Sequence, residues 1–489
     1  MQMLSKKLPV VLLVAMISVM VEGSLCAAAE PNQATNKIIV SKVVRNAAGK
    51  YYIEVDGRPF LYNAVQSWYP PEQDYALYVE KTAEANYKCF TFWLYWKHLE
   101  PVEGKRDWTE LDKIIDLANK YDVRLDIIWG GANFCGHVDP RFTPDWLFNG
   151  HQAYHIKDPN GKCVVASGFD MGNCCAADLG NDELLGKEKK MLSDLLQHLR
   201  AYDKNHRVIA IQIENEANIH GWLGGKAKNL AYINALGQVV KQSNYEMVTR
   251  VNLSGKKMDN EVDKLQYIDG HGPDPYDKSV ALIRDILESN ENTRFKYIAE
   301  NAAYENSTSL IITALAEGGF YNIYRLDYDS VWNKPGVYDK NFQYWEVTYK
   351  IKNLNKGLNK MGSLIAQSPK NKMVAFNTEM DYPSGSYKVK DHPSGSYKAK
   401  KILSLKKIGF ESKDGSKPVG IIIENDNKFY CVADDMACLV FESAPQCEAG
   451  YFDASGKWIK EVLIEYKAVS ASEYQVDYKV GDCMRVVLP

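Results

Sequence analysis

Between residues 60 and 365 the sequence alternates between short apolar runs and longer amphipathic stretches, and this alternation constrains the fold more than any other feature. The short runs have the length and content of buried strands, and the longer stretches have the apolar spacing of helices. Eight strand–helix units in about 300 residues predict an α/β fold, a (β/α)8 TIM barrel. We expect strands at about Phe60–Gln66, Lys88–Tyr95, Val123–Trp129, Val208–Ile213, Met247–Asn252, Tyr267–His271, Phe295–Glu300 and Phe320–Leu326.

Beyond Ser368 the helical pattern gives way to short alternating strands, which predicts a C-terminal all-β accessory domain of the sandwich type. Within it, residues 381–390 and 391–400 form a tandem repeat rich in Pro, Gly and Ser. We interpret the repeat as a duplicated hairpin or loop; a pair of sugar-contacting tyrosines is the alternative. The predicted domains are a signal peptide at 1–29, a barrel with an N-terminal hairpin at 36–365, and a β-sandwich at 366–489.

The composition is that of a globular protein long enough for two domains, with 489 residues of which 46% are hydrophobic. The net charge of −3 does not suggest a nucleic acid or an anionic membrane as a partner. The 31 tyrosines and 10 tryptophans supply many aromatic faces, and such faces can stack on sugars, although most aromatic residues lie in protein cores.

The first residues have the pattern of a targeting segment. Lys6 and Lys7 precede an apolar run that ends near Val21, and the alanines at 27–29 offer a cleavage site. The run is too short for a spanning helix, so we expect no transmembrane segment in the mature chain and a secreted, periplasmic or cell-surface location. Lipid anchoring at Cys26 is the alternative.

Carboxylates follow two of the predicted strands. The fourth strand runs directly into Glu214, Asn215 and Glu216, and the seventh ends in Glu300. Strand ends at the C-terminal face of a barrel are where such folds place acid and base groups. A retaining glycosidase needs two carboxylates about 5–5.5 Å apart, one acting as general acid and then base and the other as nucleophile. The alternative is a strand end whose charges are simply solvated.

Three sequence blocks resemble the retaining glycosidases of clan GH-A, above all the family 35 and family 42 β-galactosidases. I-Q-I-E-N-E at residues 211–216 is similar to the acid/base strand of the clan. The segment 91–112 is similar to W-x-x-x-E-P-x-x-G-x-x-D-(F/W), and T-P-D-W-L at 143–147 resembles P-x-W-L. The resemblance covers the barrel and implies that Glu100, in the second block, is structural.

The resemblance also implies roles at the strand ends. Because the clan pairs Asn with Glu, Glu216 rather than Glu214 is the expected acid/base, and Asn215 is expected to hold the sugar 2-hydroxyl. Glu300 is the expected nucleophile. No cofactor or metal is expected for this chemistry.

Two positions depart from the family 35 pattern. Trp93 stands where that family has a tyrosine, and Gly136-His137 stands where it has an Ala-Glu pair that contacts galactose. Loss of a polar group that reads a hydroxyl can reduce discrimination by orders of magnitude. We therefore expect weak hydrolysis of simple β-galactosides.

Other residues near strand ends are candidates for substrate binding, although each taken alone fits a core position better. The full set of candidates for binding, in addition to Asn215, is Trp68, Trp93, Trp129, His137, His271, Tyr276 and Trp332. In the clan, a residue after the sixth strand often bonds the nucleophile, which favours His271 and Tyr276.

A loop of about fifty residues, from Gly130 to Gly180, is expected to follow strand three and to overhang the mouth. It holds Cys135, Cys163, Cys174 and Cys175, for which three pairings are open. A structural zinc with the nearby histidines is the alternative. Either would offset the entropy cost of ordering a long loop.

Together these features predict a secreted retaining glycoside hydrolase that cleaves a β-linked oligo- or polysaccharide. A non-hydrolytic glycan-binding protein built on the same barrel is the rival hypothesis, because a fold does not guarantee activity. Turnover of aryl β-glycosides, or glycan affinity without turnover, separates the two.

Overall fold

The computed structural model describes residues 37–489 except 68–74, 134, 137, 169–171, 290–293, 331–332, 377–385, 389–396, 400–407, 412–417, 436, 442 and 472. The expected signal peptide and Cys26 lie outside these described residues. Residues Ile38–Pro489 form one compact unit. Among the helices described, none is long and apolar enough to cross a membrane.

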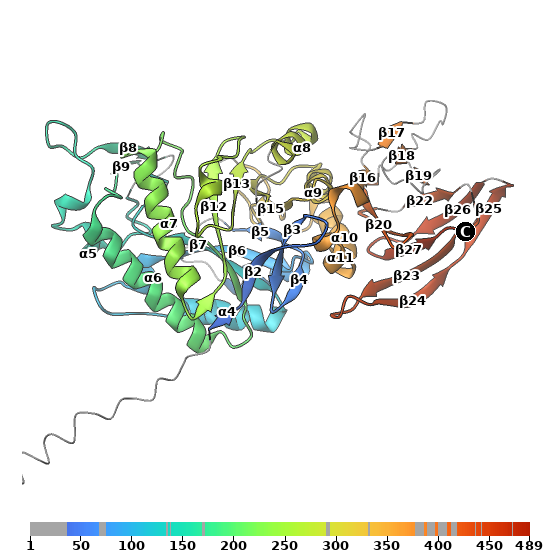
Figure 1. Cartoon of the computed structure of the whole chain (residues 1–489), viewed down its shortest axis with the longest axis horizontal. Coiled ribbons are helices and arrows are strands. Elements are labelled where there is room, and N and C mark those ends of the chain that lie inside the picture. The colour runs from blue at the N-terminus through green and yellow to red at the C-terminus, as the bar shows by residue number, and fades with distance from the viewer. Residues whose placement is uncertain are drawn as a thin grey trace, which may run out of the picture. The chain divides into compact units, whose positions relative to one another are not determined.

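Eight parallel strands form a closed barrel, as the strand–helix alternation predicts (Figure 1). They are β5 (Asn63–Gln66), β6 (Cys89–Tyr95), β7 (Arg124–Gly130), β10 (Val208–Gln212), β12 (Val248–Ser254), β13 (Gly270–Asp274), β14 (Tyr297–Asn301) and β15 (Phe320–Tyr324). Neighbours in the chain pair in order, and a parallel bridge between His271 and Lys296 joins β13 to β14. Because both faces of the sheet are covered, nearly every strand residue is buried.

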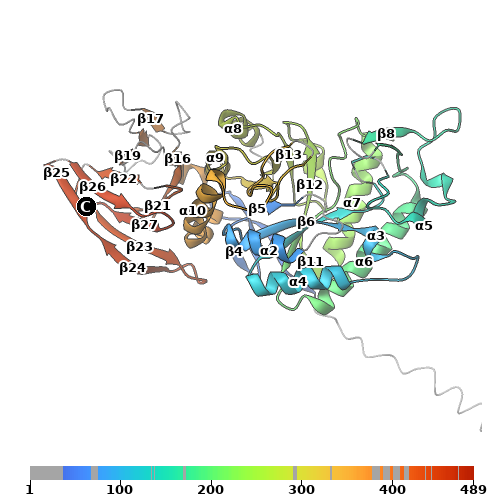
Figure 2. The ribbon, with the colours of Figure 1, turned by 180° about the vertical axis from the view of Figure 1, so that it is seen from behind.

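Helices surround the barrel, as the two opposite views show (Figures 1 and 2). They are α2 (Tyr75–Glu84), α3 (Trp96–Leu99), α4 (Thr109–Tyr121), α6 (Asp182–Tyr202), α7 (Lys226–Gln242), α8 (Val280–Glu288), α9 (Ser307–Ala316), α10 (Glu346–Lys360) and α11 (Gly362–Gln367). Helix α6 buries one apolar stripe, with Leu192 and Leu195 among its residues, and it begins at Asn181, whose side chain accepts from the backbone N–H groups of Glu183 and Leu184. Helix α9 is buried all round, because C-terminal strands cover its outer face and Thr308 donates to Asp434 at 2.8 Å.

The expected N-terminal hairpin is a three-stranded antiparallel sheet of β2 (Ser41–Arg45), β3 (Tyr51–Val55) and β4 (Arg58–Phe60). A short strand β1 (Ile38–Ile39) pairs with β11 (Tyr245–Glu246) before β12. Short 3-10 turns η2 (Val262–Lys264) and η3 (Lys370–Lys372) lie in connecting segments.

The long loop after β7 has structure of its own. It contains α5 (Asp145–Phe148), the 3-10 turn η1 (Gln152–Tyr154) and a hairpin of β8 (Val165–Gly168) and β9 (Gly172–Cys175). A disulfide joins Cys163 to Cys175, whereas Cys135 and Cys174 form no disulfide. No cluster of three or more metal-binding side chains occurs within the residues that the structure describes.

The C-terminal region consists of antiparallel sheets, as predicted. One sheet has the order β16 (Met373–Phe376), β20 (Gly420–Asn425), β21 (Lys428–Ala433), β27 (Cys483–Val487), β23 (Gln446–Phe452) and β24 (Trp458–Ile464). The other has the order β19 (Ile408–Glu411), β22 (Ala437–Phe441), β26 (Glu473–Tyr478) and β25 (Tyr466–Ser470). Apolar side chains from both sheets share one core, for example Phe429 and Val476.

The tandem repeat lies mostly outside the described residues. Each copy supplies one described strand, β17 (Ser386–Lys388) and β18 (Tyr397–Ala399), and the two pair antiparallel.

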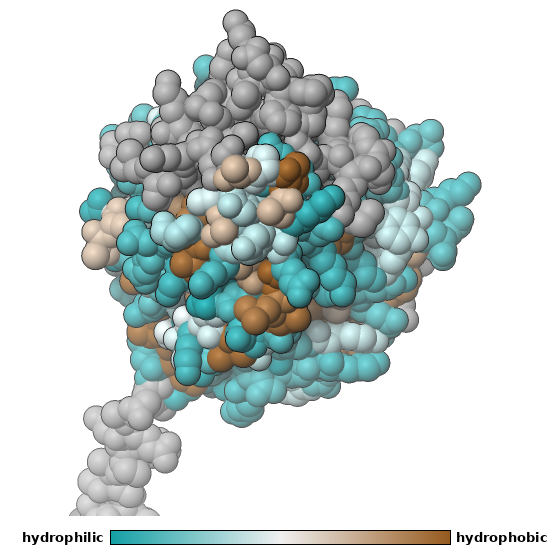
Figure 3. Space-filling view, turned by 90° about the vertical axis from the view of Figure 1, so that its right-hand side faces the viewer, coloured by the Kyte–Doolittle hydropathy of each residue, from teal (hydrophilic) through white to brown (hydrophobic). Residues whose placement is uncertain are grey.

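Apolar side chains are exposed on β24 and β25, among them Val462, Leu463 and Val469. The view onto the C-terminal end shows apolar areas within a largely hydrophilic face (Figure 3).

Candidate active site

The end of β10 carries two carboxylates in different surroundings. Glu214 is buried and accepts hydrogen bonds from Asn133 Nδ2 at 3.0 Å and from Asn215 N at 2.9 Å. Glu216 is partly exposed, and its φ of +43° places it in the left-handed region that a glutamate seldom adopts. The turn therefore directs the Glu214 carboxyl under the loop after β7 and leaves the Glu216 carboxyl at the mouth of the barrel.

Glu300 reaches the barrel interior because β14 contains a bulge. Tyr297 also points inward, where its hydroxyl lies 3.4 Å from Arg250 Nη1, yet in a regular strand residues three apart point to opposite faces. Between Ile298 and Asn301 the register against β15 shifts by one residue. This extra residue turns Glu300 inward, which is a common use of bulges near active sites.

Three donors hold the Glu300 carboxyl. Tyr276 OH donates to Oε2 at 2.6 Å, Gln66 Nε2 donates to Oε1 at 2.9 Å, and Asn252 Nδ2 lies 3.3 Å from Oε1. Burial raises the pKa of Glu300, and the bonds from Tyr276 and Gln66, together with the positive charge of Arg250, act in the opposite direction.

Asn252, on β12, connects the two sides of the site. Its Oδ1 accepts from Glu216 N and from Gln212 Nε2, each at 2.9 Å. Its Nδ2 lies 2.8 Å from Asn215 Oδ1 and also contacts Glu300. One buried amide therefore sets the positions of the backbone of Glu216, the side chain of Asn215 and the carboxyl of Glu300.

The pKa of Glu216 is raised to about 7. Burial is the main cause and the negative charge of Glu300 the second, while contacts with Ser254 and Cys135 act the other way. A carboxylic acid with such a pKa keeps its proton near neutrality and can act as a general acid.

A buried ion pair lies deeper in the barrel. Arg250 Nε donates to Asp126 Oδ2 at 2.7 Å, and both side chains are fully buried. Arg250 also donates to Gln212, which in turn bonds Asn215 and Asn252. The guanidinium of Arg250 lowers the pKa of Glu300 and so favours the ionised form of this carboxyl.

A third carboxyl, Asp274, lies beside Glu300. Its Oδ2 accepts from Asn252 Nδ2 at 2.7 Å, whereas its Oδ1 has no hydrogen-bond partner among the described residues. Burial and then the charges of Glu300 and Glu216 raise its pKa well above the usual range.

Cys135, in the loop after β7, contacts Asn215 and Glu216 at the end of β10. Its Sγ accepts from Asn215 Nδ2 at 3.1 Å and lies 3.9 Å from Glu216 Oε2. Consecutive positive φ angles at Cys135 and Gly136, +50° and +75°, form the turn that brings the thiol there. Burial raises the thiol pKa, so the sulfur remains protonated.

Two of the expected sugar contacts point away from the site. Trp129 is 2% exposed and faces α6, where its Nε1 donates to Glu188 at 2.8 Å. His271 is fully buried, and its Nε2 accepts from Asp259 N at 2.9 Å. Strand six extends three residues beyond the predicted end at His271, so by alternation Asp274 points inward and His271 outward. Neither ring has a free face for a sugar.

The remaining predicted residues have different outcomes. Trp93 lies on the inward face of β6 but is buried, with its ring stacked on Phe142 at 5.9 Å. Tyr276 is 43% exposed at the mouth while its hydroxyl bonds Glu300. Trp68, His137 and Trp332 lie outside the described residues.

Sequence reasoning missed several residues of the site. They are Gln66, Cys135, Asn252 and Asp274, with Arg250 and Asp126 beneath them. A signal was present, because polar residues at alternate positions of otherwise apolar strands, as in R-V-N at 250–252, indicate polar groups on one face of a strand.

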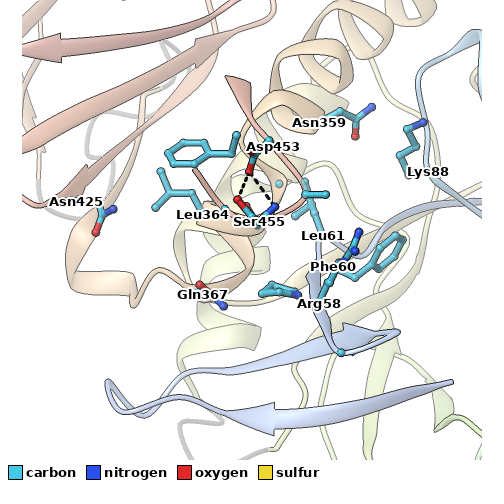
Figure 4. A pocket seen from close by; sticks show the side chains of 17 residues that line it. Arg58, Phe60, Leu61, Lys88, Asn359, Leu364, Gln367, Asn425, Asp453 and Ser455 are labelled. Atoms are coloured by element: carbon cyan, nitrogen blue, oxygen red, sulfur yellow. Dashed lines mark hydrogen bonds between the residues drawn. The ribbon is translucent and has the colours of Figure 1, made fainter. Parts of the chain in front are cut away.

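A pocket elsewhere on the protein contains none of these carboxylates (Figure 4). It is lined by residues near the N-terminal ends of the first strands, such as Phe60 and Lys88, and by the turn after β23, where Asp453 bonds Ser455. In TIM-barrel enzymes the catalytic groups lie at the opposite, C-terminal face, so we do not assign this pocket a catalytic role.

Comparison with known families divides the barrel into two halves. Residues 68–228 match the family described as Beta-galactosidase, glycoside hydrolase family 42. Residues 229–383 match a domain of unknown function, DUF4978. The first match contains Glu216 and the second contains Glu300. No curated protein matches the sequence of this chain.

Solved structures with a similar fold include glycosidases. A polyextremophilic β-galactosidase from the haloarchaeon Halorubrum lacusprofundi has 10% identity and a TM-score of 0.46, over 60% of this chain and 57% of that one. A β-galactosidase from psychrophilic Marinomonas ef1 has 11% identity and a TM-score of 0.46, over 60% and 59%. The exo-β-1,4-mannosidase Op5Man5 from Opitutaceae bacterium strain TAV5 has 12% identity and a TM-score of 0.48, over 67% and 63%.

The chain therefore spans less than two thirds of the length of these solved structures, and identities this low carry no information about substrate. The chain folds into a (β/α)8 barrel, and residues 68–228 of this barrel match the glycoside hydrolase family 42 model. In this part of the barrel the sequence is similar to the β-galactosidases of that family.

Proposed function

We propose that this protein is a retaining β-glycosidase in which Glu216 is the acid/base and Glu300 is the nucleophile. The observation that carries the proposal is the contrast between two neighbouring carboxyls. Glu216 is partly exposed with a pKa raised to about 7, and Glu300 is held by donors that favour its ionised form. Where the surroundings of two carboxyls separate their pKa values in this way, the carboxyl with the higher pKa serves as the acid and the other as base or nucleophile.

The catalytic cycle follows from these positions. Glu216 donates its proton to the glycosidic oxygen as Glu300 attacks the anomeric carbon, and a covalent glycosyl-enzyme forms. Glu216, now ionised, takes a proton from the water that releases the sugar with its original configuration. Tyr276 donates to Glu300 and orients the attacking oxygen. Asn215, fixed through Asn252, is the candidate partner of the sugar 2-hydroxyl.

The proposed substrate is a β-linked glycan met outside the cytoplasm. The expected signal peptide and the Cys163–Cys175 disulfide support this location, because disulfides persist in oxidising compartments. The mass of the purified mature protein tests it, with removal of residues 1–29 as the expected result. A mature chain that retains those residues would contradict it.

The direct test of the mechanism is covalent trapping. A 2-deoxy-2-fluoro glycosyl fluoride slows release of the glycosyl-enzyme, and peptide mapping of the inactivated protein is expected to place the label on Glu300. A label on another carboxyl would reassign the nucleophile. Glycan binding with neither label nor turnover would favour the non-hydrolytic alternative.

Glu214→Gln and Glu216→Gln form a matched pair of variants, because the two side chains stand two residues apart in different surroundings. We expect loss of acid/base function, with azide-accelerated turnover of an aryl substrate, only in Glu216→Gln. Azide acceleration confined to Glu214→Gln would mean that Glu214, and not Glu216, is the acid/base.

A further inference from the structure

The third carboxyl of the site has no role in the two-carboxylate cycle. Asp274 is 2% exposed and lies at the end of β13. β13 approaches β14 closely at Gly272, where a Cβ would come within 2.4 Å of the carbonyl oxygen of Tyr297. This glycine allows the strand that carries Asp274 to lie against the strand that carries Glu300.

The distance between the two carboxyls is limited by their shared donor. Asn252 Nδ2 lies 2.7 Å from Asp274 Oδ2 and 3.3 Å from Glu300 Oε1, so these oxygens are no more than about 6 Å apart. Burial of Asp274 and, next, the negative charge of Glu300 at that separation both raise the pKa of Asp274. Simultaneous ionisation of both is therefore disfavoured near neutrality, and one proton remains.

Hydrogen bonding decides which carboxyl holds that proton. Glu300 receives bonds from Tyr276 and Gln66 as well as from Asn252. Asp274 receives one, from Asn252, and its Oδ1 has no partner among the described residues. Because donors stabilise the charged form, Glu300 ionises first. The charged or titratable groups around Asp274 are Glu300, Glu216, Arg250, Tyr276 and Tyr297.

We propose that Asp274 is a positioning residue that remains a neutral carboxylic acid while Glu300 is ionised, and that it thereby keeps Glu300 available as a nucleophile at neutral pH. Its role in catalysis rests on the proposed function, whereas its protonation does not. In the neutral form it still accepts from Asn252 and so keeps that amide in place for Asn215 and Glu216.

The first test observes the proton directly and needs no turnover. An infrared difference spectrum of wild type minus Asp274→Asn at pH 7 is expected to contain a protonated-carboxyl C=O band. In Glu300→Gln the neighbouring charge is absent, so the band is expected to be lost at a lower pH than in wild type, although burial still raises the pKa of Asp274. A difference spectrum without the band at pH 7 overturns the proposal. Should Asp274→Asn fail to fold, the pH at which the band is lost is compared in Glu216→Gln with and without Glu300→Gln, because Glu216 itself carries a proton near pH 7. An unchanged pH of loss overturns the proposal.

The second test uses the acid side of the pH profile of kcat/KM. Asparagine imitates the neutral acid, so Asp274→Asn is expected to keep its acidic midpoint within about half a pH unit of wild type. If Asp274 were instead the ionised partner, the midpoint would fall by roughly two pH units. Asp277→Asn is the matched control, because Asp277 accepts from Lys256 outside the site. This substitution is expected to leave the profile unchanged.

The two proposals fail in different ways. A protein that shows the band but hydrolyses no β-glycoside contradicts the proposed function and leaves the protonation of Asp274 standing. A protein that hydrolyses β-glycosides, lacks the band and shows the large acidic displacement contradicts the role of Asp274 alone.

Discussion

The backbone N–H of Glu216 donates to Asn252 Oδ1 at 2.9 Å. This bond ties a residue with a left-handed backbone to the fifth strand of the barrel, so the turn that exposes Glu216 is held by tertiary contact. The same amide contacts Glu300 through its nitrogen. The geometry of both carboxyls therefore depends on one residue outside their own strands.

Asn252→Ala is expected to reduce kcat/KM by about 10²-fold while the protein remains folded, since it removes a buried group bonded to several site residues. Steady-state kinetics and circular dichroism provide the measurement. Asn234→Ala, whose side chain accepts from Tyr267 N on the outer side of the barrel, is the control. Equal losses in both variants would mean that Asn252 has only a general structural role.

Glu216→Gln is expected to lower kcat/KM by about 10²–10⁴-fold for substrates with poor leaving groups. The acid must be protonated, so wild-type activity is expected to fall as pH rises through about 7, the raised pKa of Glu216. The variant lacks this alkaline decline. A decline that persists unchanged in Glu216→Gln would assign it to another group.

Glu300→Gly is expected to abolish turnover of an activated glycosyl fluoride or aryl glycoside. External azide can occupy the space of the lost nucleophile and is expected to restore a product of inverted configuration. The configuration of the azide adduct by NMR is the measurement. Near-normal rates in this variant, without azide, would show that the nucleophile has been misassigned.

Cys135→Ala is expected to move the alkaline midpoint upward by up to about one pH unit, because the thiol stabilises the ionised form of Glu216. Cys135→Ser keeps a donor and is expected to restore the midpoint. Cys89→Ala, a buried thiol in the same barrel, serves as the control. A midpoint that is the same in all these proteins would exclude the thiol.

The raised pKa of Glu216 also affects stability. The pKa of Glu216 is about 7 in the folded protein and about 4.3 in an unfolded chain, so the folded state binds more protons between these values. Its contribution to stability is therefore present at low pH and is lost as pH rises toward 7. Glu216→Gln is expected to be more stable than wild type at pH 8, by roughly 1–3 kcal/mol, and equal to it at pH 4. Urea unfolding at both pH values tests this.

The loop after β7 is expected to restrict the substrate. By the resemblance to family 35, Gly136-His137 replaces the Ala-Glu pair that contacts galactose in that family. We therefore expect p-nitrophenyl β-galactoside to be a weak substrate beside the best of a broad panel. The double variant Cys163→Ser, Cys175→Ser lacks the disulfide. It is expected to raise KM more than it lowers kcat, because the β8–β9 hairpin loses its crosslink while the carboxyls of the site are unchanged. A preference for the galactoside, with an unimpaired His137→Ala variant, would refute this role of the loop.

Much of the fold could be predicted from the sequence because its signals are local. The eight apolar runs and the helical spacing between them predicted the barrel, and the change to short alternating runs predicted the antiparallel C-terminal sheets. Glu216 and Glu300 could be nominated because each follows an apolar run at a countable position. Those signals depend only on neighbours along the chain, so they can be recognised in the sequence without tertiary information.

Tertiary structure decided which way the side chains point. Trp129 and His271 looked like residues of the mouth, yet both face outward, because side-chain direction reverses with each residue and depends on where a strand ends. Glu300 faces inward only because of a bulge against β15, which no local pattern reveals. The Asn252–Asp274 contact joins two strands whose register is set by barrel closure, so the third carboxyl became visible only in the folded protein.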